Sequence, residues 1–242
     1  MRFSHMISFI VPAHNEEQLL GRTLEALHAA AQDVDVAYEL IVVDDASNDR
    51  TAEIAGAAGA RVITVNHQQI ARARNAGAAA AAGDLLVFVD ADTIINARTL
   101  RATIAEVDHG AVGGGALLSF DDPMPLSMRA LAATVAVGMR VGRMAAGAYL
   151  FCTAPAFKVV GGFDETLFAT EELTMSRALR KAGRIVILRE RVLTSGRKAR
   201  THGLAELFAP LGVLLRHGPS ALRDRTRMSF WYGRRRHDPR QP

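Results

Sequence analysis

The alternation of short apolar runs with helical segments constrains the fold of this chain more than any other feature. Four runs rich in β-branched residues each precede a stretch in which apolar residues recur at helical spacing. The runs lie at 7–11, 39–43, 61–65 and 85–89, and the helices are expected near 20–31, 51–58, 69–82 and 98–107. Buried strands that alternate with helices are typical of a mostly parallel sheet covered on both faces. The sequence therefore predicts an α/β domain with a Rossmann-like sheet.

The second half of the chain is less regular. Three consecutive glycines at 113–115 interrupt an apolar run, and helical spacing returns over about 125–146 and again before Gly183. An apolar run at 184–188 predicts one more strand. Because neither an internal repeat nor a linker divides the chain, we expect one domain over 1–200 and a C-terminal extension over 201–242.

Composition limits the cellular setting. With 242 residues, 49% of them apolar, the chain can bury one sizeable core. Its single cysteine, Cys152, excludes an intramolecular disulfide and fits a reducing compartment. The first residues lack a signal-peptide pattern, and the apolar runs at 131–139 and 204–215 are shorter than the roughly 18 residues of a spanning helix. A cytoplasmic protein without a membrane span is therefore expected.

Carboxylates follow two of the predicted strands. Ligands of parallel α/β sheets bind beyond the carboxyl ends of the strands, and here Asp44 and Asp45 follow the second run and Asp90 and Asp92 the fourth. Such carboxylates repel one another unless a cation or hydrogen-bond donors gather them. Two aspartates at a strand end also supply the oxygen ligands that Mg²⁺ or Mn²⁺ takes beside substrate phosphates. Asp90-Ala91-Asp92 therefore predicts a divalent-cation site.

Five motifs, in this order, resemble those of the family 2 inverting glycosyltransferases, which have the GT-A fold. They begin with Ile10-Val11-Pro12-Ala13-His14-Asn15-Glu16-Glu17 and continue with the segments 41–51, 73–77, 88–92 and 161–165. With the elements around them they span about 7–188. The resemblance implies a GT-A type fold and transfer of a sugar from a nucleotide-diphosphate sugar, with UDP- or GDP-sugars as donors and Mg²⁺ or Mn²⁺ as cofactor.

The resemblance also implies which residues hold the donor. The matching positions are Pro12, Ala13, Glu16, Asp44, Asp45, Arg74, Asp90 and Ala91. Among these, Asp45 is implied to accept a hydrogen bond from the base and Arg74 to contact the donor. Structural alternatives stay open, because the acids also suit the cap of the following helix and Arg74 also suits an exposed helix position.

The family usually has Glu-Asp at the start of the last core helix, where the second acid removes a proton from the acceptor. This sequence has Glu171-Glu172 instead, which keeps the carboxylate but lengthens it by one methylene. By resemblance Glu172 is the first candidate for the catalytic base and Glu171 the second. The alternative is electrostatic, since acids stabilise a helix N-terminus without any catalytic role.

A basic loop at 194–198 resembles one found in some family members. Arg197 in this loop is a candidate to clamp the donor's diphosphate, and His202 is a candidate third metal ligand beside Asp90 and Asp92. A solvated loop is the alternative for both residues.

The expected reaction is inverting, metal-dependent transfer to an acceptor hydroxyl. Two rivals remain. The first is a non-catalytic nucleotide-sugar-binding or scaffold protein, which is considered because Glu172 replaces the aspartate that is usual in the family. A sugar nucleotidyltransferase has a related sheet, but it should carry a glycine-rich basic loop after the first strand, where this chain has Pro12-Ala13-His14-Asn15-Glu16.

The extension at 201–242 is basic and amphipathic. Leucines at helical spacing precede a segment, 228–236, in which aromatic residues adjoin arginines. This composition suits an anionic membrane surface, at the inner face of the membrane and close to a lipid-linked acceptor. The alternative is a helix packed on the domain with a solvated basic end. Nucleic acid is not an expected partner, because the acid-rich strand ends repel phosphates.

Overall fold

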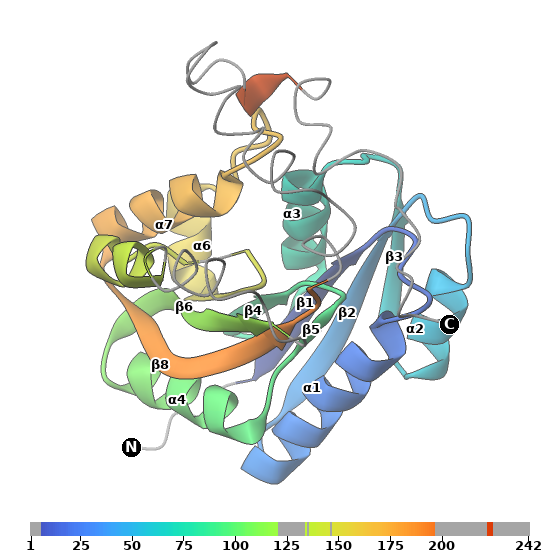
Figure 1. The fold of residues 1–242 in the computed structure, drawn as a ribbon, viewed down its shortest axis with the longest axis horizontal. Coiled ribbons are helices and arrows are strands. Elements are labelled where there is room, and N and C mark those ends of the chain that lie inside the picture. The colour runs from blue at the N-terminus through green and yellow to red at the C-terminus, as the bar shows by residue number, and fades with distance from the viewer. Residues whose placement is uncertain (1–5, 121–133, 135, 146, 197–221, 225–242) are drawn as a thin grey trace.

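The computed structural model describes residues 6–120, 134, 136–145, 147–196 and 222–224 (Figure 1). Its strands are β1 (Ile7–Ala13), β2 (Tyr38–Asp45), β3 (Arg61–Val65), β4 (Leu85–Val89), β5 (Thr93–Ile94), β6 (Ala111–Phe120), β7 (Tyr149–Thr153) and β8 (Arg184–Thr194). Its helices include α1 (Leu20–Val34), α2 (Thr51–Ala57), α3 (Ile70–Ala80), α4 (Ala97–Asp108), α6 (Ala154–Val160) and α7 (Glu171–Ala182). The predicted strand–helix alternation is present through α4.

One eight-stranded sheet has the order β3-β2-β1-β4-β7-β6-β8-β5. The strands β3, β2, β1 and β4 are parallel neighbours, as the alternation predicted. The pairs β4–β7, β6–β7 and β5–β8 are antiparallel, whereas β6 and β8 are parallel. The sheet is therefore mixed, with parallel pairs in the majority.

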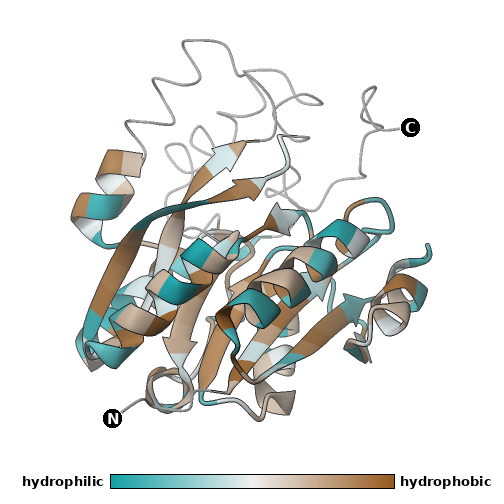
Figure 2. Cartoon of the chain, turned by 90° about the horizontal axis from the view of Figure 1, so that it is seen from below, coloured by the Kyte–Doolittle hydropathy of each residue, from teal (hydrophilic) through white to brown (hydrophobic). Residues whose placement is uncertain are grey.

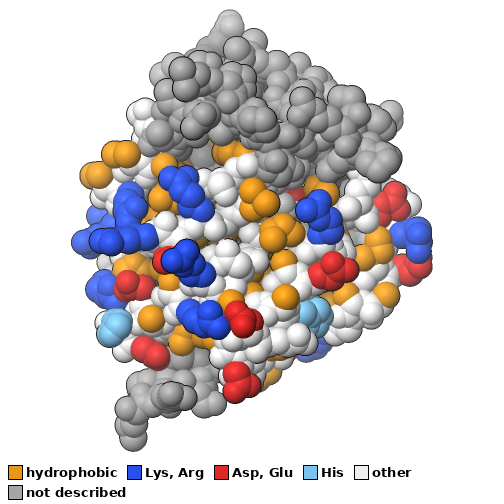
Figure 3. All heavy atoms as spheres, turned by 60° about the horizontal axis from the view of Figure 1, so that its bottom comes forward, with side chains coloured by type: hydrophobic (Ala, Val, Ile, Leu, Met, Phe, Trp, Pro, Cys, Tyr) orange, Lys and Arg blue, Asp and Glu red, His pale blue; other side chains and the backbone are white. Residues whose placement is uncertain are grey.

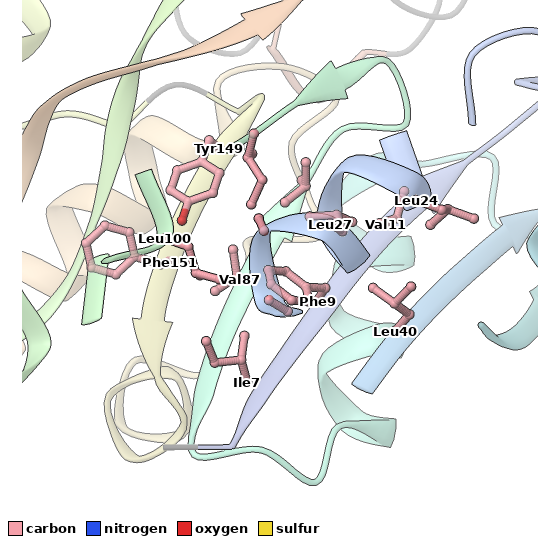
Figure 4. Packing of buried hydrophobic residues seen from close by; sticks show 14 of the residues in the cluster. Ile7, Phe9, Val11, Leu24, Leu27, Leu40, Val87, Leu100, Tyr149 and Phe151 are labelled. Atoms are coloured by element: carbon pink, nitrogen blue, oxygen red, sulfur yellow. The ribbon is translucent and has the colours of Figure 1, made fainter. Parts of the chain in front are cut away.

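Helices cover both faces of the sheet. Alternate residues of a strand point to opposite sides, so one strand contributes side chains to the cores on both faces. Phe9 and Val11 of β1 join a core that includes α1 and α4, whereas Ile10 joins a second core with residues of α3, α6 and α7. Figure 4 shows the first core, with Leu24 and Leu27 of α1 packed over the strands. Figure 2 shows the helices on this side of the sheet. Many of their outward-facing residues are hydrophilic, whereas the strands behind them are largely hydrophobic.

The glycines at 113–115 do not break the chain but lie within β6. A Cβ on Gly114 or Gly115 would approach backbone oxygens of the neighbouring strands too closely, so small residues let β7 and β8 flank β6. The final strand also runs further than the predicted 184–188, and β7 and α6 were not predicted. Hydrophobic periodicity does not predict these elements, because their burial depends on contacts with segments that are distant in sequence.

The predicted helix over 125–146 is described at 134 and 136–142, which are helical, while 121–133 lie outside the described residues. Of the C-terminal extension only 222–224 are described. The Phe168 N–H donates to the Leu222 carbonyl at 2.8 Å, so this short stretch contacts the loop before α7. Among the helices that the structure describes, none has the length and hydropathy needed to cross a membrane.

Candidate functional site

The loops that follow β1 and β2 are bound to each other at the carboxyl edge of the sheet. The Asn15 N–H donates to Ser47 Oγ at 2.9 Å, and the Asn48 N–H donates back to Asn15 Oδ1 at 2.7 Å. The Glu16 N–H donates to Thr51 Oγ1 at 2.8 Å. Pro12 and Ala13, buried at the end of β1, thus lie in a rigid edge beside the end of β2.

Asp44 and Asp45 are both buried at the end of β2. Asp45 accepts hydrogen bonds from the backbone N–H groups of His67, Gln68 and Gln69, at 2.6, 2.7 and 3.0 Å. Its carboxylate therefore holds the loop that leads into α3. Asp44 Oδ1 accepts from the Ser47 N–H at 3.2 Å, which closes the turn after the strand. In this structure both acids order loops around the expected donor site.

Arg74 is a buried bridge between two parts of the site. Its Nη2 donates to Asp90 Oδ1 at 2.9 Å, and its Nη1 donates to Glu171 Oε1 at 2.8 Å. The Gly147 carbonyl accepts a third bond at 3.1 Å, and the guanidinium lies 5.3 Å from the centre of the Phe163 ring. The side chain is only 2% exposed, so the exposed-helix alternative for this arginine is wrong.

Opposing effects act on the charge of Arg74. Burial by itself lowers its pKa, but the carboxylates of Asp90 and Glu171 outweigh that effect, and the pKa is raised. The arginine therefore stays charged and holds the end of β4 against the start of α7. Among the residues that the structure describes, its buried Nε–H has no hydrogen-bond partner, so within them the bridge carries one unsatisfied donor.

The two glutamates at the start of α7 have different environments. Glu171 is 4% exposed and paired with Arg74, whereas Glu172 is partly buried. Burial raises the pKa of Glu172 to about 7, with a further contribution from the charge of Glu171 that Arg74 partly offsets. A carboxyl with this pKa exchanges its proton near neutral pH, as a general base must.

Asp90-Ala91-Asp92 follows β4 directly, as the sequence predicted. The Asp90 side chain is 32% exposed, and one of its oxygens is bound to Arg74. Asp92 is partly exposed and lines a small crevice of about 30 Å³ with Arg22 and Thr194. The described residues contain no group of three or more His, Cys, Asp or Glu side chains that could hold a metal. Two aspartates nevertheless fit the chemistry of Mg²⁺ or Mn²⁺, which commonly binds one or two carboxylates together with substrate phosphates.

Two of the candidate residues, Arg197 and His202, lie outside the described residues. Two other residues were missed: Gly147 and Phe163, which surround the Arg74 guanidinium. A Cβ built on Gly147 would lie 3.1 Å from Arg74 Nη2 and 3.2 Å from Glu172 Oε1, so a larger residue would crowd both side chains. Phe163 lies inside the fifth motif, and its position there was the one sequence signal for it.

Comparison with known sequences identifies relatives that match part of the chain. A stretch of 97 residues is 41% identical to 4,4'-diaponeurosporenoate glycosyltransferase of Staphylococcus haemolyticus, covering 37% of this chain and 25% of that protein. A stretch of 95 residues is 38% identical to undecaprenyl-phosphate 4-deoxy-4-formamido-L-arabinose transferase of Pseudomonas aeruginosa, covering 36% and 28%. The matched stretches thus span less than a third of these relatives.

Solved structures share the fold over most of this chain. A mannosyltransferase from Pyrobaculum calidifontis, in complex with GDP-Man and Mn²⁺, aligns with a TM-score of 0.70 at 18% identity, over 92% of this chain and 65% of that one. TarS 1–349 of S. aureus, in complex with UDP-GlcNAc, aligns with a TM-score of 0.64 at 23% identity, over 86% and 65%. The sequence also matches the profile of Glycosyl transferase family 2 over residues 8–144, which is more than half of the chain. This chain belongs to glycosyl transferase family 2.

Proposed function

We propose that this protein is an inverting glycosyltransferase that uses a nucleotide-diphosphate sugar and a divalent cation. The observation that carries the proposal is the Arg74 bridge, which brings the acids after β4 and the acids of α7 into one site. Glycosyl transfer by direct displacement needs these two functions together: a site for the leaving diphosphate and a base for the attacking hydroxyl.

Asp92 and the Asp90 oxygen that Arg74 does not bind would hold Mg²⁺ or Mn²⁺. When bound, the ion supplies positive charge against the departing nucleoside diphosphate. The likeness to neighbours whose structures contain Mn²⁺ with GDP-Man, or UDP-GlcNAc, supports a nucleotide-sugar donor. The ordered loops after β1 and β2, with Pro12, Ala13, Glu16, Asp44 and Asp45, would form the nucleotide end of the site.

Glu172 rather than Glu171 would be the catalytic base. The Glu171 carboxylate is buried and held by Arg74, which stabilises its charged form and occupies one of its oxygens. Glu172 has a pKa raised to about 7, so its carboxylate takes up a proton more readily than an ordinary glutamate. Arg74 would fix the spacing between this base and the donor, and its contact with the donor itself stays a prediction.

In the proposed reaction Glu172 removes the proton of the acceptor hydroxyl as its oxygen attacks the anomeric carbon. The new glycosidic bond forms while the bond to the diphosphate breaks, and the configuration at that carbon inverts. The relative from P. aeruginosa is named for an undecaprenyl-phosphate acceptor, which supports a lipid-linked acceptor here as well.

Two variants separate the donor site from the base. Asp92→Asn should abolish cation-dependent binding of the donor, because it removes the negative charge of one of the two carboxylates that would hold the cation. Glu172→Gln should leave donor binding intact and lower the rate of transfer by about 10²- to 10⁴-fold, since it removes general-base catalysis. Binding is measured by calorimetry against UDP- and GDP-sugars with Mn²⁺, and transfer by release of the nucleoside diphosphate.

The outcomes distinguish the proposal from a binding or scaffold role. Donor binding that Asp92→Asn leaves unchanged would contradict the cation site. A wild-type protein that binds donor but shows no turnover, and that Glu172→Asp does not activate, would favour the non-catalytic alternative.

A further inference from the structure

We propose that residues 136–145 and the outer side of α7 form a docking surface for an anionic lipid bilayer. The surface, here called the basic face, consists of two exposed valines and the exposed cationic side chains of the same two segments: Val137, Val141, Arg140, Arg143, Arg177, Arg180 and Lys181. The inference rests on the proposed function and deepens it, because it assigns the acceptor to the class of lipid-borne molecules.

Hydrogen bonds hold the two parts of the basic face together. Arg180 Nη1 donates to the Gly142 carbonyl at 3.0 Å, and the Ala145 N–H donates to Ser176 Oγ at 3.0 Å. The helical residues 136–142 therefore lie against α7, as the left side of Figure 1 shows. Cations of both segments consequently belong to one surface.

The basic face has no acidic side chain of its own. Neither 136–145 nor α7 after Glu172 contains an aspartate or glutamate. The opposite side, around α1 and α4, has a mixed surface in which Arg101 pairs with Asp33, and Figure 3 shows acidic and basic side chains interspersed there. An anionic partner is thus attracted to the basic face in particular, since clustered basic residues near a membrane attract its anionic headgroups.

The exposed valines favour a bilayer over a nucleic acid. Val137 is 62% exposed and Val141 is 82% exposed, and they lie one helical turn apart on the same side of the helix. Apolar side chains amid basic ones suit the boundary between headgroups and acyl chains. Nucleic-acid surfaces instead use aromatic side chains for stacking, and the basic face has none.

The position of the basic face relative to the candidate site indicates how docking on a bilayer would serve the proposed reaction. The segment that carries Val141 leads through Ala145 to Gly147, whose carbonyl binds Arg74 and where a Cβ would lie 3.2 Å from Glu172 Oε1. A bilayer on the basic face would therefore lie on the side of the molecule that carries the proposed base. A lipid-borne acceptor could reach Glu172 without leaving the membrane.

The first experiment measures binding of the full chain to phosphatidylcholine vesicles with and without phosphatidylglycerol. Binding is expected to anionic vesicles and to weaken with added salt. The variant Arg140→Gln/Arg177→Gln removes two charges, each contributing about a fivefold factor, so the affinity should fall about 25-fold. The matched control, Arg61→Gln/Arg98→Gln, removes two exposed charges elsewhere and should bind like the wild type.

A gain-of-binding variant guards against loss through misfolding. Val141→Trp places an aromatic ring that favours the membrane interface at the most exposed valine, and it should bind anionic vesicles several-fold more tightly. Unchanged affinity in both Val141→Trp and Arg140→Gln/Arg177→Gln would overturn the inference and assign any vesicle binding to other residues. Absence of vesicle binding, or preferential binding to an RNA oligonucleotide, would overturn it as well.

The test is separable from the proposed function. Binding of UDP- or GDP-sugar, measured without vesicles, should be the same in Arg140→Gln/Arg177→Gln as in the wild type. Vesicle binding without any donor binding would support docking through the basic face and contradict the glycosyltransferase proposal. Donor binding without vesicle binding would support the donor site and contradict docking through the basic face.

Discussion

The proton on Glu172 depends on its burial and on two charged neighbours. Burial and the charge of Glu171 raise the pKa to about 7, and Arg74 limits the increase. A base acts only when it is deprotonated, so kcat/KM for transfer should fall as the pH drops through the pKa of Glu172, approach a tenfold loss for each pH unit well below it, and level off above it. The measurement is a pH series of initial rates at saturating Mn²⁺. A flat profile in the acid range would contradict the assignment of Glu172 as the base.

Arg74 should matter for stability as well as for the site. Arg74→Met leaves the Asp90 and Glu171 carboxylates without their partner, and loss of one member of a buried ion pair costs about 3–5 kcal/mol. Urea denaturation followed by circular dichroism gives the free energy of unfolding. Arg98→Met is the control, because Arg98 is exposed and should change stability by less than about 0.5 kcal/mol. Equal losses in the two variants would mean that the bridge contributes nothing.

At the level of elements, the contact between α3 and β1 depends on a glycine. A Cβ on Gly77 would lie too close to Ile10 and 3.0 Å from a methyl of Val43, so no larger residue fits without moving the helix. Gly77→Ala should therefore destabilise the protein by about 1–3 kcal/mol. Gly56→Ala in α2 is the matched control, since no atom of the described residues beyond its chain neighbours and the backbone of its own helix lies within 4 Å of the added Cβ, and it should stabilise by up to about 1 kcal/mol. Melting temperatures that moved in the same direction would refute this explanation.

For the whole molecule, donor binding should stabilise the fold, because the proposed site would join the ends of β1, β2 and β4 to α7. A ligand at 100 times its dissociation constant adds about 2.7 kcal/mol to the free energy of unfolding. UDP or GDP with Mn²⁺ should accordingly raise the melting temperature, and EDTA should reverse the increase. Asp92→Asn should show no such shift. A shift that persists in EDTA would mean that nucleotide binds without the cation.

Local sequence patterns were enough to predict the parallel half of the sheet, the family and the position of Asp90-Ala91-Asp92. Buried β-branched runs, helical spacing and short motifs are local properties of the chain, so they can be recognised from the order of the residues alone. They did not determine that Arg74 is buried, that Asp45 binds the loop before α3, or that the glycines at 113–115 lie within a strand. Those facts depend on which distant segments meet: α7 supplies Glu171 to Arg74, and β7 and β8 flank β6. Only the tertiary structure fixes such contacts, because the free energy of burying a charge or omitting a Cβ depends on neighbours that the local sequence does not contain.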